Sequence, residues 1–526
     1  MKTYPSIFND VIGPVMRGPS SSHCAASLRI GRLCRDLMGQ QLNHVLIQFD
    51  TRGSLATTHK SQGSDMGLFG GLLGWEAYDE RLPESAHFME LAAITAEIEI
   101  LDMGATHPNT YCMTMSNPYH SHRLTAISTG GGMIEVTEVD GIGVSMAGDF
   151  YEILVYCDSP ERVQGFAGQW LEAEEISWHP GASSFVEIKS RQLPSESLCQ
   201  ELEHLDGVHL VRTLSPVLPV LSRKDLQVPF ITVEEMLAYN QGKNLSLWEL
   251  AVAYESERGG IGSQEVYDKM KEIVGIMSRA VQQGLKGTSY QDRILGSQSL
   301  QLKKQMDSGQ LMAGDTLNTI IMYVSSIMEV KSSMGVIVAA PTAGSCGALP
   351  GAVIGMADAL QLGEQDRVRA MLGAGLIGVF IAAHATFAAE VGGCMAECGS
   401  GSGMAAAALT AMGGGHLDQC LGAASMALQN ALGLICDPIG NRVEAPCLGR
   451  NVMAATNAVS CANMALSDYN HLIPLDQVIE TMQDVGNQIH HTLRCTNLGG
   501  LSVTKAAREL EQKLEQQSIQ PIFKIC

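Results

Sequence analysis

Residues 152–214 read EILVYCDSPERVQGFAGQWLEAEEISWHPGASSFVEIKSRQLPSESLCQELEHLDGVHLVRTL, in which short apolar runs alternate with helix-forming runs. EILVYCD, EISWHP, SSFVEIKSR and VHLVRTL are rich in β-branched and aromatic residues, which is typical of strands. SPERVQGFAGQWLE and PSESLCQELEHLDG are typical of short helices. The predicted order is therefore β-α-β-β-α-β. This is the ferredoxin-like order of small regulatory modules, and we expect such a module over residues 149–222.

The chain upstream of this stretch mixes strand-like and helix-like runs separated by Gly-rich turns. HVLIQFDTRGSL at 44–55 and GMIEVTEVDGIGVSMAG at 132–148 are expected to form strands. HFMELAAITAEIEILDMG at 87–104 is expected to form a helix. This mixture predicts an α/β domain over residues 1–148.

The chain downstream of the stretch begins with a proline-spaced segment, at Pro216, Pro219 and Pro229, which indicates a linker. Beyond it the pattern is almost wholly helical, and the composition is rich in Ala, Gly and Met. We therefore predict an α+β multidomain fold, with an all-helical domain over residues 223–526 after the α/β domain and the ferredoxin-like module.

One helix-like run imitates a membrane span. Residues 371–389 (MLGAGLIGVFIAAHATFAA) are uncharged and long enough to cross a bilayer. The run is rich in Gly and Ala, and small residues let neighbouring helices approach closely. A buried helix in a tightly packed bundle fits this composition better, so we expect no membrane partner.

The charge balance limits the partners that this chain can have. Its 526 residues include 34 basic and 55 acidic side chains, for a net charge of −21. This acidity argues against nucleic acids and anionic membranes as partners. The first residues, MKTYPSIFND, lack the apolar core of a secretion signal. We therefore expect a cytoplasmic protein with reduced thiols rather than a disulfide framework.

The last residue, Cys526, has three candidate partners: Cys394 in GGCMAECG, Cys436 in GLICDPIG and Cys447 in EAPCLGRN. Gly, Pro and Asp beside these cysteines let the backbone bend the thiolates toward one centre. Four thiolates are the usual ligands of an iron–sulfur cluster, and a terminal one would be displaced most easily. The alternative is that each cysteine is a small core residue, because spacings of 42 and 11 residues match no zinc motif. Cys398, in CGSGSG, is expected in a loop outside the ligand set.

A serine-rich loop precedes the helix-like run CAASLRIGRLCRDLMG. It contains Ser20, Ser21 and Ser22 after a Gly-Pro pair. Such a loop at a helix N-terminus can bind a carboxylate through hydroxyl and backbone donors. The alternative is that the serines simply cap the helix. His23, the next residue, is a candidate proton carrier or substrate donor.

Six motifs follow one another along nearly the whole chain: GPSSSH (18–23), HPNT (107–110), STGGG (128–132), AAPTAGSCG (339–347), CDPIG (436–440) and APC-x-x-RN (445–451). Together they resemble the iron–sulfur-dependent L-serine dehydratases. Six matches in order are far more specific than any single motif. That family includes single-chain enzymes and enzymes split into two subunits, with a small α/β domain and a helical catalytic domain.

The resemblance implies elimination of water from L-serine or a related β-hydroxy amino acid, which gives a 2-oxo acid (pyruvate) and ammonia. It implies a 4Fe-4S cluster held by Cys394, Cys436 and Cys447, with Cys526 on the fourth iron of the resting enzyme. It also implies an ACT-like identity for the 149–222 module and a homodimer. Substrate binding is assigned to residues of the matched motifs: Ser20, Ser21, Ser22, His107, Asn109, Thr342 and Gly344.

The expected elimination needs a Lewis acid for the hydroxyl group and a base for the α-proton. Where the family reads K-G-H-x-T-D, residues 60–65 read KSQGSD, so Gln62 replaces the usual catalytic histidine. Glutamine cannot act as a base near neutral pH. Either the base has moved, to His59, His23 or His107, or the substrate differs from serine. An extended loop would weigh against His59, because extended residues three apart face opposite sides.

Two other functions remain open. One is a related lyase for a different small hydroxy- or sulfur-containing acid, and the other is a catalytically silent iron–sulfur sensor. Pyridoxal phosphate is a rival cofactor for serine deamination, but no glycine-rich loop accompanies a suitable lysine. Lys60 and Lys331 are expected on the surface or on helices.

The C-terminal segment is expected to return the last cysteine to the cluster. Residues 506–517 (AARELEQKLEQQ) predict an exposed helix, which Pro521 ends. Ile522, Phe523 and Ile525 would then dock in an apolar groove. The alternative is a frayed terminus.

Overall fold

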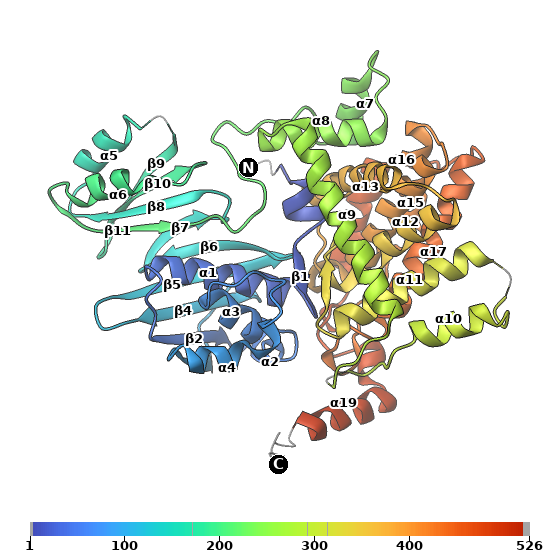
Figure 1. The fold of residues 1–526 in the computed structure, drawn as a ribbon, viewed down its shortest axis with the longest axis horizontal. Helices are drawn as coiled ribbons and strands as arrows, with labels where there is room; N and C mark the ends of the chain where they lie inside the picture. The colour runs from blue at the N-terminus through green and yellow to red at the C-terminus, as the bar shows by residue number, and fades with distance from the viewer. Residues whose placement is uncertain (1–3, 171, 292, 313, 519–526) are drawn as a thin grey trace. The chain divides into compact units, whose positions relative to one another are not determined.

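The computed structural model describes residues 4–170, 172–291, 293–312 and 314–518 (Figure 1). The chain divides into two compact units. We call Ser22–Leu226 the α/β unit, and Met1–Ser21 together with Gln227–Cys526 the helical unit. Helices and several sheets give a mixed α+β multidomain fold, as predicted. The three-domain division drawn from the sequence has other boundaries, since residues 1–21 of its first domain fall in the helical unit, and it stays a prediction.

Six strands of the α/β unit form one sheet in the order β3-β2-β4-β5-β6-β7 (Figure 1). β2 and β3 are parallel, and the other neighbours are antiparallel. Helices α1 (Ala26–Leu37) and α3 (Ser64–Leu72) pack on each other, and Leu33 and Leu68 share one apolar core with Ile47. The strands and the remaining helices are β2 (His44–Asp50), β3 (Thr95–Leu101), β4 (Thr110–Ser116), β5 (Ser121–Gly130), β6 (Met133–Val139), β7 (Ile142–Met146), α2 (Leu55–Thr58) and α4 (Ser85–Leu91).

The run 87–104, predicted as one helix, forms the end of α4 and then strand β3. The prediction is wrong for its second half. Ala93 has a positive φ of 56°, beyond which the chain pairs with β2 along its whole length. Ala96 and Ile98, two residues apart, pack on the core of the sheet. Ala, Glu and Leu favour helices locally, but pairing in the sheet outweighs that preference.

Residues 152–214 form the predicted elements in the predicted order, and their four strands make an antiparallel sheet in the order β11-β8-β10-β9. Alternate side chains of β8 face opposite sides of this sheet. Ile153 and Val155 join a core with Leu202 of α6, whereas Leu154 and Tyr156 join the core of the six-stranded sheet. The elements are β8 (Tyr151–Cys157), α5 (Glu161–Ala167), β9 (Ala173–His179), β10 (Phe185–Ser190), α6 (Glu196–Glu203) and β11 (Val208–Leu214).

Helices dominate the helical unit (Figure 1). α13, α15, α16 and α17 pack side by side, and the many Gly and Ala residues on them allow this close approach. The helices are α7 (Val233–Asn240), α8 (Leu247–Gly259), α9 (Ser263–Leu285), α10 (Ser299–Asp307), α11 (Asp315–Ser332), α12 (Ala348–Ala359), α13 (Glu364–His384), α14 (Ala389–Cys394), α15 (Ser400–Met412), α16 (Leu417–Gln429), α17 (Cys447–Leu466), α18 (Leu475–Gln488) and α19 (Lys505–Ser518).

The helical unit also contains a small sheet, so the all-helical prediction for residues 223–526 is wrong there. β12 (Val336–Val338) pairs antiparallel with β1 (Val15–Arg17). Gly13 and Ala339 continue the contact through a backbone hydrogen bond of 2.9 Å. Val-Ile-Val favours a strand, but its partner lies more than three hundred residues earlier in the chain. Local pattern could not reveal that pairing.

The run that imitates a membrane span belongs to α13, which begins at Glu364 and ends at His384. It is long and apolar enough to cross a bilayer, but 72% of its most apolar window is buried inside the protein. A core helix meets the same length and composition criteria. The expected buried helix is therefore confirmed, although it ends five residues before the predicted boundary.

Candidate metal centre

A kink positions the first cysteine of the centre. α14 ends at Cys394, and Gly393 before it has φ 69° and ψ −172°. A Cβ atom at Gly393 would lie 2.7 Å from the backbone oxygen of Leu434, so both the conformation and the space require glycine. The chain then enters a π-helix, η5 (Met395–Gly399), which carries Glu397 and Cys398 and leads into α15.

The expectation that Cys398 lies in a loop is therefore wrong. The Gly- and Ser-rich run after it is helical because its small side chains allow close packing. A Cβ atom at Gly403 of α15 would lie 3.0 Å from Cγ of Leu428 on α16. Contact between helices here outweighs the low helix propensity of glycine. Cys398 lies one helical turn after Cys394 and hydrogen-bonds to it.

The other cysteines arrive from separate segments. Cys436 lies beside a later segment, because its N–H donates to Leu493 O at 2.8 Å and its carbonyl accepts from the Cys495 N–H at 2.9 Å. Cys447 is the first residue of α17. The kink at Gly393, the backbone hydrogen bonds of Cys436 and the start of α17 thus bring the sulfur atoms of Cys394, Cys436 and Cys447 together.

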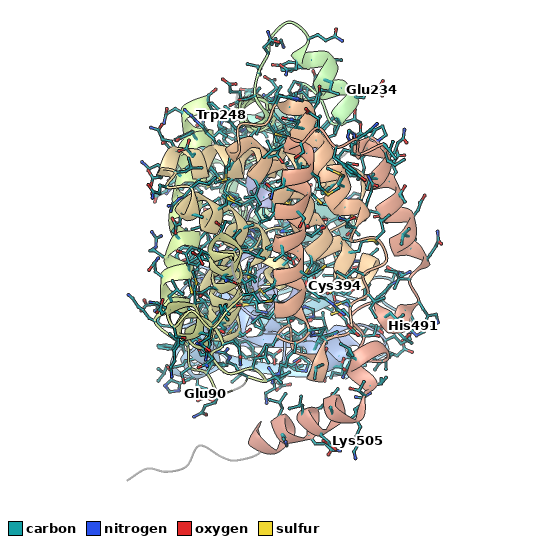
Figure 2. All side chains as sticks on the ribbon, turned by 90° about the vertical axis from the view of Figure 1, so that its right-hand side faces the viewer. Glu90, Glu234, Trp248, Cys394, His491 and Lys505 are labelled. Atoms are coloured by element: carbon teal, nitrogen blue, oxygen red, sulfur yellow. The ribbon has the colours of Figure 1, made fainter. Side chains whose placement is uncertain are left out.

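Side chains of Cys394, Glu397 and Cys436 could bind one metal ion, because their ligand atoms all lie within 4.8 Å of one another. Cys394 and Cys436 are buried, and Figure 2 shows Cys394 among the helices of its unit. Hydrogen bonds from the thiols of Cys398 and Cys436 hold the pKa of Cys394 well below its usual range. These hydrogen bonds favour the thiolate form of Cys394 over its thiol form.

Two further cysteines extend this sulfur group. Cys495 packs on the buried pair Cys394 and Cys436, and its side chain hydrogen-bonds that of Cys436. Cys447 interacts electrostatically with Cys394, and burial raises the pKa of its thiol. Burial thus favours the protonated thiol at Cys447.

Two cations face the sulfur atoms. Arg450 donates from Nη1 to the sulfur of Cys394 at 3.4 Å and from Nη2 to Asp437 at 2.5 Å. Lys331 of α11 is fully buried, and its Nζ donates to the backbone oxygen of Val443. Lys331 is thus on a helix, as expected, and away from the surface. Both charges favour thiolate over thiol at the centre.

Hydrogen bonds of the Asn451 side chain connect loop 339–347 to the cysteine centre. Its Oδ1 accepts hydrogen bonds from the backbone N–H groups of Gly347 and Ala348 at 3.1 and 3.0 Å, at the start of α12. Its Nδ2 donates to the backbone oxygens of Gly344 and Cys447, at 2.8 and 2.9 Å. One buried side chain therefore positions Gly344, a predicted substrate-binding residue, together with the candidate ligand Cys447.

Glu397 connects the same loop to the cysteines. Thr342 donates from Oγ1 to Glu397 at 2.7 Å. Burial raises the pKa of Glu397 to about 8, and the nearby Cys394 thiolate adds to this shift. Most of this carboxyl group is therefore protonated at neutral pH.

The serine loop reaches loop 339–347 within the helical unit. The hydroxyl oxygen of Ser21 accepts a hydrogen bond from the Ala343 N–H at 3.2 Å, and Ser20 is buried. A π-helix, Ser21–Ala25, continues directly into α1, whose N-cap residue is Ala25, so helix capping by the serines stays an alternative to carboxylate binding. Ser22, the next residue, belongs to the α/β unit.

In the α/β unit, the GPSSSH and HPNT motifs meet in one polar network. His23 lies with Nε2 2.9 Å from Oγ1 of Thr58, which itself donates to Ser54 O at 2.7 Å. The Ser54 hydroxyl donates to Asn109, whose N–H donates to His107 Nδ1 at 3.2 Å. Burial lowers the pKa of His23 to about 4, so its imidazole is neutral at pH 7.

The segment with the missing histidine is helical rather than extended. Backbone N–H groups of His59 and Gln62 donate to the carbonyls four residues earlier, at 3.0 and 2.8 Å. Residues three apart in such a segment lie on the same side. His59 Nδ1 lies 2.7 and 2.9 Å from the two oxygens of Asp65, which fix the ring. The argument against His59 from an extended loop therefore does not apply.

The donor set fits an iron–sulfur cluster. Cysteine thiolates are the usual ligands of such clusters, and five cysteines with two cations gather in one largely buried region. Cys526 lies outside the described residues, so its role stays a prediction.

Sequence reasoning missed Glu397, Cys495, Arg450, Asn451 and Lys331. Arg450 and Asn451 stand inside the motif APC-x-x-RN, but the sequence held no signal for Cys495.

A family model described as serine dehydratase alpha chain matches residues 242–502. The chain is 36% identical to the probable L-serine dehydratase alpha chain of Bacillus subtilis (strain 168), over 54% of this chain and 95% of that one. The chain is also 42% identical to the probable L-serine dehydratase beta chain of the same organism, over 29% of this chain and 68% of that one.

Full-length relatives are also found. L-serine dehydratase TdcG of Escherichia coli (strain K12) is 26% identical over 92% of this chain and 96% of its own length. The matches to separate alpha and beta chains thus fall within one polypeptide. The chain belongs to the iron–sulfur-dependent L-serine dehydratase family, in its single-chain form.

Proposed function

We propose that this protein is an L-serine ammonia-lyase, which removes water from L-serine and releases pyruvate and ammonia. The observation that supports it most is the buried sulfur group of Cys394, Cys436 and Cys447 beside Arg450, in a chain whose relatives carry the name L-serine dehydratase. Loss of water from serine gives an enamine, which tautomerises to an imine and hydrolyses. The reaction needs no net oxidation or reduction.

We propose a 4Fe-4S cluster as the cofactor. Cys394, Cys436 and Cys447 would hold three irons, and Cys526 the fourth in the resting enzyme. When bound, the cluster supplies a Lewis-acidic iron for the substrate hydroxyl. Arg450 and Lys331 offset the negative charge that the thiolates bring into a buried site.

The proposed base is His59. Its Nδ1 is held by Asp65, which leaves Nε2 as the atom that takes the α-proton. The paired carboxylate fixes the orientation of the ring and stabilises the imidazolium that forms. His23, hydrogen-bonded to Thr58, and Gln62 would bind and orient the substrate instead.

Substrate carboxylate and amino groups would be bound by residues of the matched motifs. The hydroxyl groups of Ser20, Ser21, Ser22 and Thr342 are donors for a carboxylate, as is the backbone N–H of Gly344. His107 and Asn109 share the network of His23 and offer polar atoms of both kinds. These assignments rest on the family resemblance and on the buried position of the serines.

The proposal extends to the domains and the assembly. Residues 1–148 would form the substrate-loop domain, 149–222 an ACT-like module that binds a small effector, and 223–526 the catalytic domain with its tail. The order of elements in 152–214 supports the ACT-like assignment. We further propose a cytoplasmic homodimer.

A substrate panel tests the proposed function. The full chain is purified and loaded with iron and sulfide without oxygen, and pyruvate and ammonia are measured from L-serine. Equal amounts of the two products, formed only by the loaded chain, are expected. Turnover of another hydroxy or sulfur-containing acid in place of serine would contradict serine as substrate. A loaded chain without turnover of any panel member would favour the sensor.

A further inference from the structure

Cys495 has an unusual backbone conformation. Its φ is +62°, in the left-handed region that residues other than Gly, Asn and Asp seldom adopt. Such a conformation persists only where surrounding contacts impose it, and it is concentrated at functional positions.

Those contacts fix the segment that carries Cys495. Its N–H donates to the carbonyl of Cys436 at 2.9 Å. The side chain of Arg494 donates to the backbone oxygens of Ile489 and Asn487, at 2.6 and 2.5 Å. Further along, the Leu501 N–H donates to Asp437 at 2.7 Å, and Asp437 is the ion-pair partner of Arg450. The segment is therefore tied to the loop of one candidate ligand on both sides of Cys495.

The sulfur of Cys495 belongs to the same group as the three proposed ligands. It packs beside Cys394 and Cys436, hydrogen-bonds Cys436 and interacts electrostatically with Cys447. Cys495 is partly exposed as a residue, whereas the three ligands are buried, but its thiol lies inside the sulfur group. A sulfur that already hydrogen-bonds a proposed ligand can approach or leave an iron with little rearrangement.

We propose that Cys495 is a second, protein-held ligand for the fourth iron, which it binds when Cys526 has left. This inference rests on the cluster in the proposed function. In the exchange, the thiol of Cys495 releases its proton to solvent and forms a sulfur–iron bond, while the sulfur–iron bond of Cys526 breaks and its thiolate takes a proton. No electrons are transferred. Between turnovers the exchange keeps the fourth iron covered.

Substitution of both cysteines tests the proposal. Cys495→Asn keeps a hydrogen-bond donor and suits the left-handed backbone, but removes the thiolate. We would load wild type, Cys495→Asn, Cys526→Ala and the double variant without oxygen, then expose each to limiting air without substrate. Conversion of the 4Fe-4S cluster to a 3Fe-4S cluster is followed by electron paramagnetic resonance. We expect each single variant to stay within about threefold of wild type and the double variant to convert about tenfold faster.

A double variant that converts no faster than Cys526→Ala would overturn the proposal. Cys199→Asn, at another partly buried thiol, is the matched control for the substitution itself. A second measurement covers variants that load poorly: in loaded Cys526→Ala, Cys495 should react with iodoacetamide at least about tenfold more slowly than in the apo chain. Equal labelling of the two forms would also overturn it. Serine turnover, measured separately, decides the proposed function without deciding this ligand exchange.

Discussion

At the scale of single residues, the position of His59 bears on which residue is the base, since Gln62 replaces the usual catalytic histidine. The two side chains are three residues apart in a helical segment, and Asp65 orients the ring of His59. A histidine with a carboxylate partner is a suitable base, and glutamine is suited to hydrogen bonding. The helical segment thus removes the geometric argument against His59, and relocation of the base and a change of substrate stay alternatives that experiment decides.

Substitution of His59 tests this directly. His59→Asn should lower kcat for L-serine by at least about 100-fold with KM nearly unchanged, because proton removal rather than binding is affected. Asp65→Asn should give a smaller loss, since the ring remains but is no longer fixed. Initial rates of pyruvate formation, at matched iron content, provide the measurement. His87→Asn, at an exposed histidine of α4, is the control, and an unchanged kcat in His59→Asn would reject this base.

The three proposed ligands should be separable from the other buried cysteines. Cys394→Ala, Cys436→Ala and Cys447→Ala should each abolish both the iron–sulfur absorption and the activity. Cys461→Ala, at a buried cysteine in the C-terminal half of α17, should keep both. Iron and sulfide content and the visible spectrum measure how much cluster each variant holds. A full cluster in the Cys394, Cys436 or Cys447 variant would show that this residue is not a ligand.

Burial of His23 should make the apo chain less stable in acid. Its pKa is lowered to about 4 in the folded protein, against 6.5 unfolded, so the unfolded state binds the extra proton first. Its contribution to stability is thus full above pH 6.5 and is lost as pH falls toward 4. In His23→Gln, the decrease in the urea midpoint between pH 7 and pH 5 should be smaller than in wild type. Unfolding is followed by tryptophan fluorescence. An equal decrease in the urea midpoint of both proteins would show that burial of His23 does not cause the loss of stability in acid.

At the scale of elements, local pattern predicted what depends on neighbours in sequence. The order β-α-β-β-α-β and the helix over 506–517 are confirmed, because alternation and helix propensity are local properties. β3 and β12 were missed because their partners, β2 and β1, decide their conformation. The tail beyond α19, with Cys526, lies outside the described residues, so its docking stays a prediction.

The start of α12 should depend on one side chain of α17. Asn451→Ala leaves two buried backbone N–H groups of α12 without their acceptor, which costs about 1–3 kcal/mol for each group. The urea midpoint of the apo chain should therefore fall. Cluster loading should weaken because the backbone oxygen of Cys447 loses its hydrogen bond from Asn451. Asn463→Ala, at an exposed position of the same helix, should change neither property. Wild-type stability in Asn451→Ala would show that the two N–H groups find other partners.

At the scale of the whole molecule, the site is harder to predict from sequence than the fold. The motifs identified Cys394, Cys436 and Cys447, and the structure brings these three together from segments that lie far apart along the chain. Cys495 and Lys331 carry no such signal, because only the folded chain places them beside the cysteines. Glu397 stands in the run GGCMAECG, three residues after Cys394, but its contact with Thr342 is set by the fold. Contacts between distant segments are set by packing, which one sequence does not display.

The central claim is that an iron–sulfur cluster held by this chain deaminates L-serine. It is tested most directly by loading the apo chain stepwise with iron and sulfide without oxygen and measuring pyruvate formation against iron bound per chain. The account predicts no activity without iron and a rise that ends near four irons per chain. Serine deamination by the iron-free chain, or a loaded chain that leaves L-serine unchanged, would contradict it.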